Sequence, residues 1–143
     1  MDILFVAGFA PISSDPAVSN PFYRDTLGLP LETVNGDYIA VDGFAGTKHL
    51  GIWPLTEVAN SCFGTSAWPD DLPIPQATIE FELADADAVT AAVAELEAGG
   101  HQMVHGTRTE PWGQTIARLL GPDGLLVGLC HTPWLHEDAS SGS

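Results

Sequence analysis

The same order of predicted elements occurs twice in this sequence, once on each side of Pro73-Ile74-Pro75. In the first half, an apolar strand at 3–12 precedes a helical segment, and three short strands follow. In the second half, a strand at 77–83 precedes an Ala-rich helix at 85–98, and three strands follow again. An internal repeat of this kind constrains the fold more strongly than any single motif. It predicts one α+β domain of eight strands and two helices, with modules at about 1–72 and 73–136.

The first helix is predicted in two pieces. Asp15-Pro16 offers an N-cap followed by proline at the first helical position. Pro21 would remove a hydrogen bond from a helix interior and clash with the preceding turn. The sequence therefore favours one turn after Asp15 and a restart with Asn20 as the new cap. Gly28 is expected to end the restarted helix.

Turn residues separate the short strands. Asn35-Gly36 is a strong hairpin signal, and Pro122-Asp123-Gly124 predicts a second tight turn. The remaining strands are expected at 31–34, 38–41, 48–54, 101–105, 115–119 and 125–130. Residues 55–74 are predicted to form a long loop, and loops of this length usually carry a function or link two parts of a domain. Phe63 and Trp68 in this loop could cover a ligand pocket or form a small separate cluster.

Charge and cysteine content narrow the possible partners. The chain has 4 basic and 19 acidic residues, for a net charge of -15, and such a surface repels phosphate backbones and anionic lipids. Nucleic acid and membrane partners are therefore not expected. Cys62 and Cys130 make no disulfide framework, and the first apolar run is too short to cross a bilayer. We expect a cytoplasmic protein with a disordered tail at 137–143.

Two motifs within the repeated frame carry a family resemblance. They are Phe22-Tyr23-Arg24-Asp25-Thr26-Leu27-Gly28-Leu29 and Gly121-Pro122-Asp123-Gly124. With the repeat, they resemble the vicinal-oxygen-chelate superfamily of glyoxalases, ring-cleaving dioxygenases and bleomycin-resistance proteins, over nearly the whole chain. The resemblance implies two βαβββ modules whose curved mixed sheets surround a cleft. It also implies a homodimer.

Members of that superfamily that are enzymes hold a divalent metal with His, Gln and Glu side chains. By the family spacing, the matching positions here are Gly8, Gly51, Thr78 and Gly128. None of these residues is a strong metal ligand, because such metals need imidazole or carboxylate donors. The resemblance therefore points to the branch that binds a ligand without a metal or another cofactor.

Alternation along the strands predicts which side chains share the cleft with these positions. Three glycines and a threonine would leave a wide floor, with an aromatic wall and a polar edge, as in many small-molecule sites. Trp53 could equally be ordinary core, and Glu80 and Arg118 could pair with each other. No catalytic residue is assigned. The predicted ligand-binding residues are His49, Gly51, Trp53, Phe63, Thr78, Glu80, Gln114, Ile116, Arg118 and Gly128.

Three functional hypotheses follow. The first is metal-independent binding and sequestration of an aromatic small molecule, such as a natural-product antibiotic, in a self-resistance or drug-binding protein. The second is an enzyme (lyase, isomerase or dioxygenase) that works through acid–base residues, with Glu80 or His49 as the base and Arg118 stabilising an oxyanion. The third is a metal-dependent enzyme of the same family. The sequence favours a binding protein over an enzyme.

Overall fold

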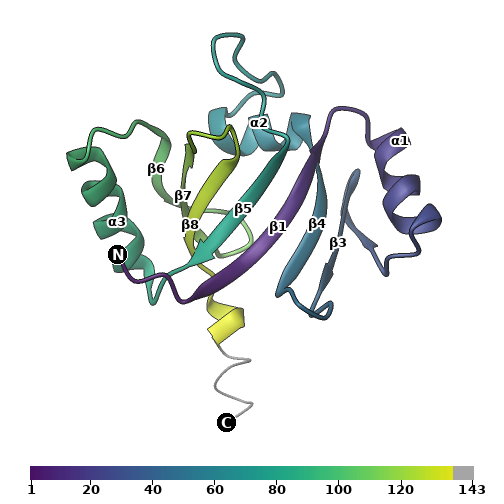
Figure 1. The fold of residues 1–143 in the computed structure, drawn as a ribbon, viewed down its shortest axis with the longest axis horizontal. Helices are drawn as coiled ribbons and strands as arrows, with labels where there is room; N and C mark the ends of the chain where they lie inside the picture. Colours follow the sequence, from purple (N-terminus) through teal and green to yellow (C-terminus); the bar gives the residue numbers. More distant parts are fainter. Residues whose placement is uncertain (137–143) are drawn as a thin grey trace.

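The computed structural model describes residues 1–136, and the tail predicted at 137–143 lies outside the described residues. Eight strands form one curved mixed sheet in the order β2-β3-β4-β1-β5-β8-β7-β6 (Figure 1). The α+β fold with two modules is therefore confirmed. The strands are β1 (Phe5–Ser13), β2 (Glu32–Asn35), β3 (Tyr38–Asp42), β4 (His49–Pro54), β5 (Ala77–Glu82), β6 (Met103–Thr109), β7 (Thr115–Leu120) and β8 (Leu126–His131).

The two modules meet edge to edge at the centre of the sheet. β1 and β5 pair antiparallel, and each also pairs in parallel with the last strand of its own module, β4 or β8. The parallel registers correspond, since Phe9 lies opposite Leu50 and Ile79 lies opposite Val127. Antiparallel pairing of β1 with β5 makes one continuous surface from the two repeats. The central strands can thus present side chains from both modules to one site.

The first helical segment is continuous at Asn20-Pro21, where the sequence predicted that one helix ends and another begins. α1 (Pro16–Pro21) continues directly into the π-helix η1 (Phe22–Thr26), so the predicted restart with Asn20 as cap is wrong. The wider turn after Pro21 lets the chain continue despite the missing N–H, and Leu27 N–H donates to Phe22 O over 3.0 Å. Asn20 instead donates from Nδ2 to Asp37 O over 2.8 Å.

The second-module helix follows its sequence signals closely. α3 (Ala86–Ala98) begins after Asp85, whose carboxylate accepts a hydrogen bond of 2.8 Å from Ala88 N–H. Its buried residues Val89 and Ala92 pack on Leu83, Ala117 and Leu129. At the other end of the sheet from α3 lie α1 and η1. There, Tyr23 packs against the cluster around Ile39 and Ile52. We call the face covered by these helices the outer face.

A third helix packs on the opposite, inner face of the sheet, where the sequence predicted a loop. α2 (Leu55–Phe63) starts immediately after Pro54 and ends at Gly64, which has φ 78°. Its buried residues Val58, Ala59 and Cys62 pack on Ala10, Trp53 and Leu126. The helix was not predicted because no Ser, Thr, Asp or Asn stands at its N-cap position to indicate its start. Burial against the inner face compensates for that missing signal.

One irregularity in β1 changes which side chains face inward. The register between β1 and β5 shifts between Val6 and Gly8. As a result, Phe5 and Ala7 join a cluster with Ile116, Cys130 and Leu135 on the inner face, although strict alternation from Gly8 would turn both side chains outward. Among residues 1–136, no helix is long and apolar enough to span a membrane.

Candidate ligand site on the inner face

The wide floor predicted from the glycines is filled by neighbouring side chains. A Cβ atom built on Gly51 would lie 2.5 Å from the hydroxyl oxygen of Tyr38. A Cβ atom on Gly128 would lie 3.1 Å from both Glu80 Cγ and Ile116 Cδ1. At Gly8, the nearest side chain is His49, at 3.6 Å from the built Cβ. The expected hollow is therefore wrong at its centre, because close packing brings larger neighbours over each glycine.

Tyr38, His49 and Asp42 form a hydrogen-bonded chain at this centre. Asp42 and His49 lie directly opposite each other in the β3–β4 hairpin, and Tyr38 is four residues before Asp42, on the same face of β3. His49 Nδ1 lies 2.5 Å from Asp42 Oδ1, and His49 Nε2 is hydrogen-bonded to the Tyr38 hydroxyl. Because the carboxylate can only accept, Nδ1 carries the proton and Nε2 accepts from the phenol. We call these three residues the relay.

The surroundings of Tyr38 keep its phenol group neutral. Burial, followed by the negative charges of Glu80, Asp42 and Glu57, raises the pKa of Tyr38 well above its ordinary value. The side chain of His49 is 34% exposed, so the middle of the relay remains open to solvent or to a ligand. The arrangement resembles the acid–base–hydroxyl order of hydrolytic triads, with a phenol in place of serine.

Gln114 fixes the carboxylate of Glu80 beside this centre. Its Nε2 donates to Glu80 Oε1 over 3.2 Å and to Thr132 Oγ1 over 3.0 Å. Its Oε1 accepts from Trp112 Nε1 over 3.0 Å. Gln114 is thus engaged at both ends of its amide, while Glu80 is only partly buried and keeps one oxygen for another partner.

Arg118 does not pair with Glu80, contrary to one expectation from the sequence. It is fully buried, and Nη1 lies 3.2 Å from Glu110 Oε1 and 3.1 Å from His105 Nε2. Its guanidinium carbon lies 5.3 Å from the ring centre of Trp53. Glu110 is buried as well, and its carboxylate offsets part of the cost of removing the Arg118 charge from water.

Four other predicted site residues lie within the packed interior or at its edge. Trp53 and Phe63 belong to the cluster beneath α2, where the Phe63 ring lies 5.1 Å from the Trp68 ring. Thr78 Oγ1 donates to Leu126 O over 2.9 Å, and Ile116 is fully buried over Gly128. Trp53 is 8% exposed, so its faces are already in contact with protein.

Sequence reasoning missed Tyr38, Asp42 and Glu110. The first two could have been found, since a hairpin at Asn35-Gly36 places residues 38 and 42 on one face beside His49. Glu110 lies outside the strands and reaches Arg118 only through the β6–β7 connection. No sequence spacing indicated that contact.

A surface hollow of about 490 Å³ lies against the loop between two relay residues, although no relay residue lines it. It is lined by Phe5, Val6 and the loop from Gly43 to Lys48, and this loop joins Asp42 directly to His49. Lys48 Nζ lies 5.2 Å from the ring centre of Phe5, while the ring of Phe44 is partly exposed. The hollow combines two aromatic rings with polar groups at its rim.

Comparison with known proteins agrees with the architecture. The sequence profile of the glyoxalase/bleomycin resistance protein/dioxygenase superfamily matches residues 9–129. The chain belongs to this superfamily. No curated protein sequence matches it.

Solved structures show the superfamily fold at low identity. A superfamily member from Vibrio splendidus 12B01 is 17% identical, with a TM-score of 0.57, over 90% of this chain and 99% of that one. A Streptomyces coelicolor methylmalonyl-CoA epimerase variant is 17% identical, with a TM-score of 0.56, over 92% and 96%. An NAD-dependent benzaldehyde dehydrogenase from Legionella pneumophila is 12% identical, with a TM-score of 0.58, over 87% and 96%.

The residues at the superfamily's metal positions do not fit a metal ion. Glycine offers no ligand atom, and a ligand-bearing side chain at position 51 or 128 would collide with Tyr38, or with Glu80 and Ile116. The hydroxyl of Thr78 is already bonded to a backbone carbonyl. These four residues therefore do not make a metal site at this location.

Proposed function

We propose that the chain binds a small organic molecule on the inner face of its sheet, without a metal ion at the superfamily position. The observation that carries this proposal is the replacement of ligand-bearing residues by glycines over which Tyr38, His49 and Glu80 now lie. These three groups offer hydrogen-bond donors and acceptors at a half-buried place. A few polar groups within an apolar surround are typical of small-molecule sites.

The ligand class we propose is an aromatic natural product, such as an antibiotic, which the protein sequesters. The hollow beside the relay has a volume within the usual range of ligand pockets, about 300–1,000 Å³. Phe44 offers a partly exposed ring for contact with such a ligand, whereas Trp53 is already stacked on Arg118. Glu80 and Asp42 would favour ligands that carry N–H or O–H donors.

Calorimetric titration against a panel of aromatic antibiotics tests this proposal. We expect at least one ligand to bind with micromolar or tighter affinity. Phe44→Ala and His49→Ala should each weaken it at least tenfold. Arg24→Ala, on the exposed π-helix, serves as the matched control and should bind like the wild type. If no panel member binds at micromolar concentration, sequestration of this class is rejected.

The relay favours acid–base catalysis as a second candidate function. As the phenol oxygen accepts a proton from a bound substrate, the phenol proton can pass to His49 Nε2, and Asp42 then stabilises the imidazolium. Such a relay suits proton abstraction next to a carbonyl, as in isomerases and lyases. Arg118 has no part in it, because it is fully buried against Glu110.

Incubation with metabolite extracts, followed by mass spectrometry, tests the second candidate. A general base contributes about 10²–10⁴-fold to a rate, so His49→Gln should lose at least a hundredfold of any activity found. Glu80→Gln separates the two candidate bases: activity that survives this change shows that Glu80 is not the base. Activity that survives His49→Gln rejects the relay.

We also propose that the protein is a homodimer, as the superfamily resemblance implies. On the central strands, the outward-facing side chain of Phe9 is 39% exposed, and that of its partner Ile79 on β5 is partly exposed. A second copy could cover these side chains where α1 and α3 leave the outer face open. Sedimentation equilibrium should give twice the chain mass, and Phe9→Glu should shift the population to monomer. A monomeric wild type at micromolar concentration rejects this proposal.

A further inference from the structure

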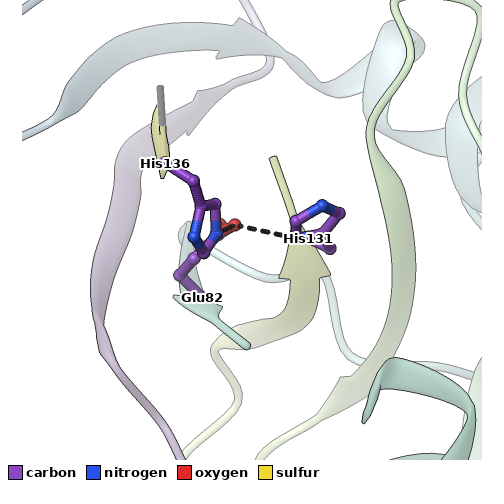
Figure 2. Close-up of side chains that lie close together, drawn as sticks. All are labelled: Glu82, His131 and His136. Atoms are coloured by element: carbon purple, nitrogen blue, oxygen red, sulfur yellow. Dashed lines mark hydrogen bonds and ion pairs between the residues drawn. The ribbon is translucent and has the colours of Figure 1, made fainter. Parts of the chain in front are cut away.

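Glu82, His131 and His136 converge at one end of the parallel strand pair β5 and β8 (Figure 2). Glu82 is the last residue of β5, and His131 is the last residue of the neighbouring β8. His136 comes from the turn that follows, where Leu135 packs into the inner-face cluster with Ile116 and Cys130. Residues far apart in the sequence are thus held together by paired strands and a buried anchor.

The ligand atoms of these residues have the spacing of a metal site. Glu82 Oε2 lies 2.7 Å from His136 Nε2 and 3.7 Å from His131 Nδ1, and one ligand atom from each residue lies within 4.8 Å of the others. Zinc–ligand distances of about 2.0–2.1 Å in a tetrahedral site put donor atoms about 3.3 Å apart. The two separations fall on either side of that value, and the shorter one is a hydrogen bond that a bound ion would replace.

Two polar groups at this place lack full compensation. Glu82 is fully buried, although it carries a carboxylate. Its Oε2 accepts from Thr132 N–H over 2.5 Å and its Oε1 accepts from Cys130 Sγ over 3.4 Å, but both donors are neutral. Only a protonated ring of His136 or His131, or a metal cation, would place a positive charge beside it. His131 Nδ1 is buried and has no hydrogen-bond partner among residues 1–136, since 3.7 Å to the carboxylate is too long. A cation between the three residues would satisfy both groups at once.

We propose that Glu82, His131 and His136 form a site for a divalent transition-metal ion, of which Zn²⁺ fits best. Two imidazole nitrogens and one carboxylate oxygen are donors of the type that Zn²⁺ prefers. Three protein donors leave a fourth position for water or a small anionic ligand. The site is distinct from the superfamily's metal position, which falls here on Gly8, Gly51, Thr78 and Gly128, and it is independent of the proposed ligand binding.

Metal titration of the full chain, stripped with a chelator and exchanged into metal-free buffer, tests the site. We expect Zn²⁺ to bind with a stoichiometry of one and micromolar or tighter affinity. Cobalt(II) bound to the wild type should show the visible d–d absorption of a four- or five-coordinate ion. This spectrum reports the coordination number without any variant. Zn²⁺ should also raise the thermal unfolding midpoint, because it binds only the folded arrangement.

Variants at the two histidines decide where the ion sits. His136→Ala changes a partly exposed side chain close to the end of the described chain, so the variant should fold. His131→Ala and His136→Ala should each weaken Zn²⁺ binding at least tenfold. His101→Ala changes an exposed residue away from the cluster, so this control should bind Zn²⁺ like the wild type. Circular dichroism checks the fold of each variant.

Two results would overturn the proposal. One is the lack of stoichiometric Zn²⁺ binding to the stripped wild type. The other is binding that neither His131→Ala nor His136→Ala weakens, which would place the ion elsewhere. Neither result affects the antibiotic titration, whose outcome depends on His49 and Phe44.

Discussion

The hydroxyl of Tyr38 lies directly over the Cα atom of Gly51, so close that a Cβ atom there would be 2.5 Å from it. The same phenol is hydrogen-bonded to His49 and is mostly buried. The absence of a side chain at position 51 is therefore what allows the relay to form. A glycine that the family spacing matches to a metal position therefore has a structural role of its own here.

Gly51→Ala should destabilise the protein, because the methyl group must displace a hydrogen-bonded ring. Overpacking of this kind costs about 1–3 kcal/mol of the free energy of unfolding. Urea denaturation measures it. Gly106→Ala is the matched control, since a Cβ atom built at this strand glycine meets no other atom within 4 Å. Equal stability of the two variants would contradict the packing of Tyr38 on Gly51.

Glu110→Gln should be one of the most destabilising single changes in the chain. It removes the carboxylate that compensates the fully buried guanidinium of Arg118. Breaking a buried pair by neutralising one partner costs about 3–5 kcal/mol. Asp25→Asn breaks the exposed pair with Arg24 and should cost less than about 1 kcal/mol. Chemical denaturation of both variants compares them, and a small effect at Glu110 would mean that Arg118 finds another partner.

Protonation of His105 should lower the free energy of unfolding in mild acid. Burial, opposed in part by a hydrogen bond to Gly106 O and reinforced by Arg118 and Arg108, lowers the pKa of His105 to about 4. Between about pH 6.5 and pH 4, the unfolded state binds a proton that the folded state does not, so stability decreases as the pH falls through this window. His105 is partly exposed, so we expect a loss of roughly 1–2 kcal/mol. His105→Gln should flatten that part of the pH profile, and an unchanged profile would contradict the assignment.

Both cysteine thiols should be unreactive in the folded protein. Burial raises the pKa of Cys62 despite the opposing charge of Arg118, and burial with Glu80 and Glu82 raises the pKa of Cys130. A thiol-specific chromogenic reagent at pH 8 should react slowly with the native chain and label two thiols per chain after denaturation. Rapid labelling of one thiol in the native protein would show that α2 or the sheet end opens readily.

Local signals in the sequence were sufficient for most elements of the fold. The Ala-rich helical run at 85–98, the hairpin at Asn35-Gly36 and the turn at Pro122-Asp123-Gly124 depend on signals within a few residues, and each is confirmed. The helix α2 was missed because its stability comes from packing on the inner face. The uninterrupted α1–η1 segment was missed because a π turn accommodates Pro21.

The site was only partly predictable, for the same reason. Alternation correctly placed Glu80, Gly128 and Arg118 on one face, as their register shows. It could not show that Arg118 pairs with Glu110, or that a bulge turns Phe5 and Ala7 inward.

Residue identity and short-range spacing are enough to indicate the superfamily, the repeated modules and the lack of ligand-bearing residues at four positions. What occupies the space beside the glycines depends on the three-dimensional packing. It placed Tyr38 over Gly51, joined Asp42 to His49, and brought His131 and His136 to Glu82. Such contacts depend on side-chain volume and strand register across the whole sheet, and no local pattern encodes them.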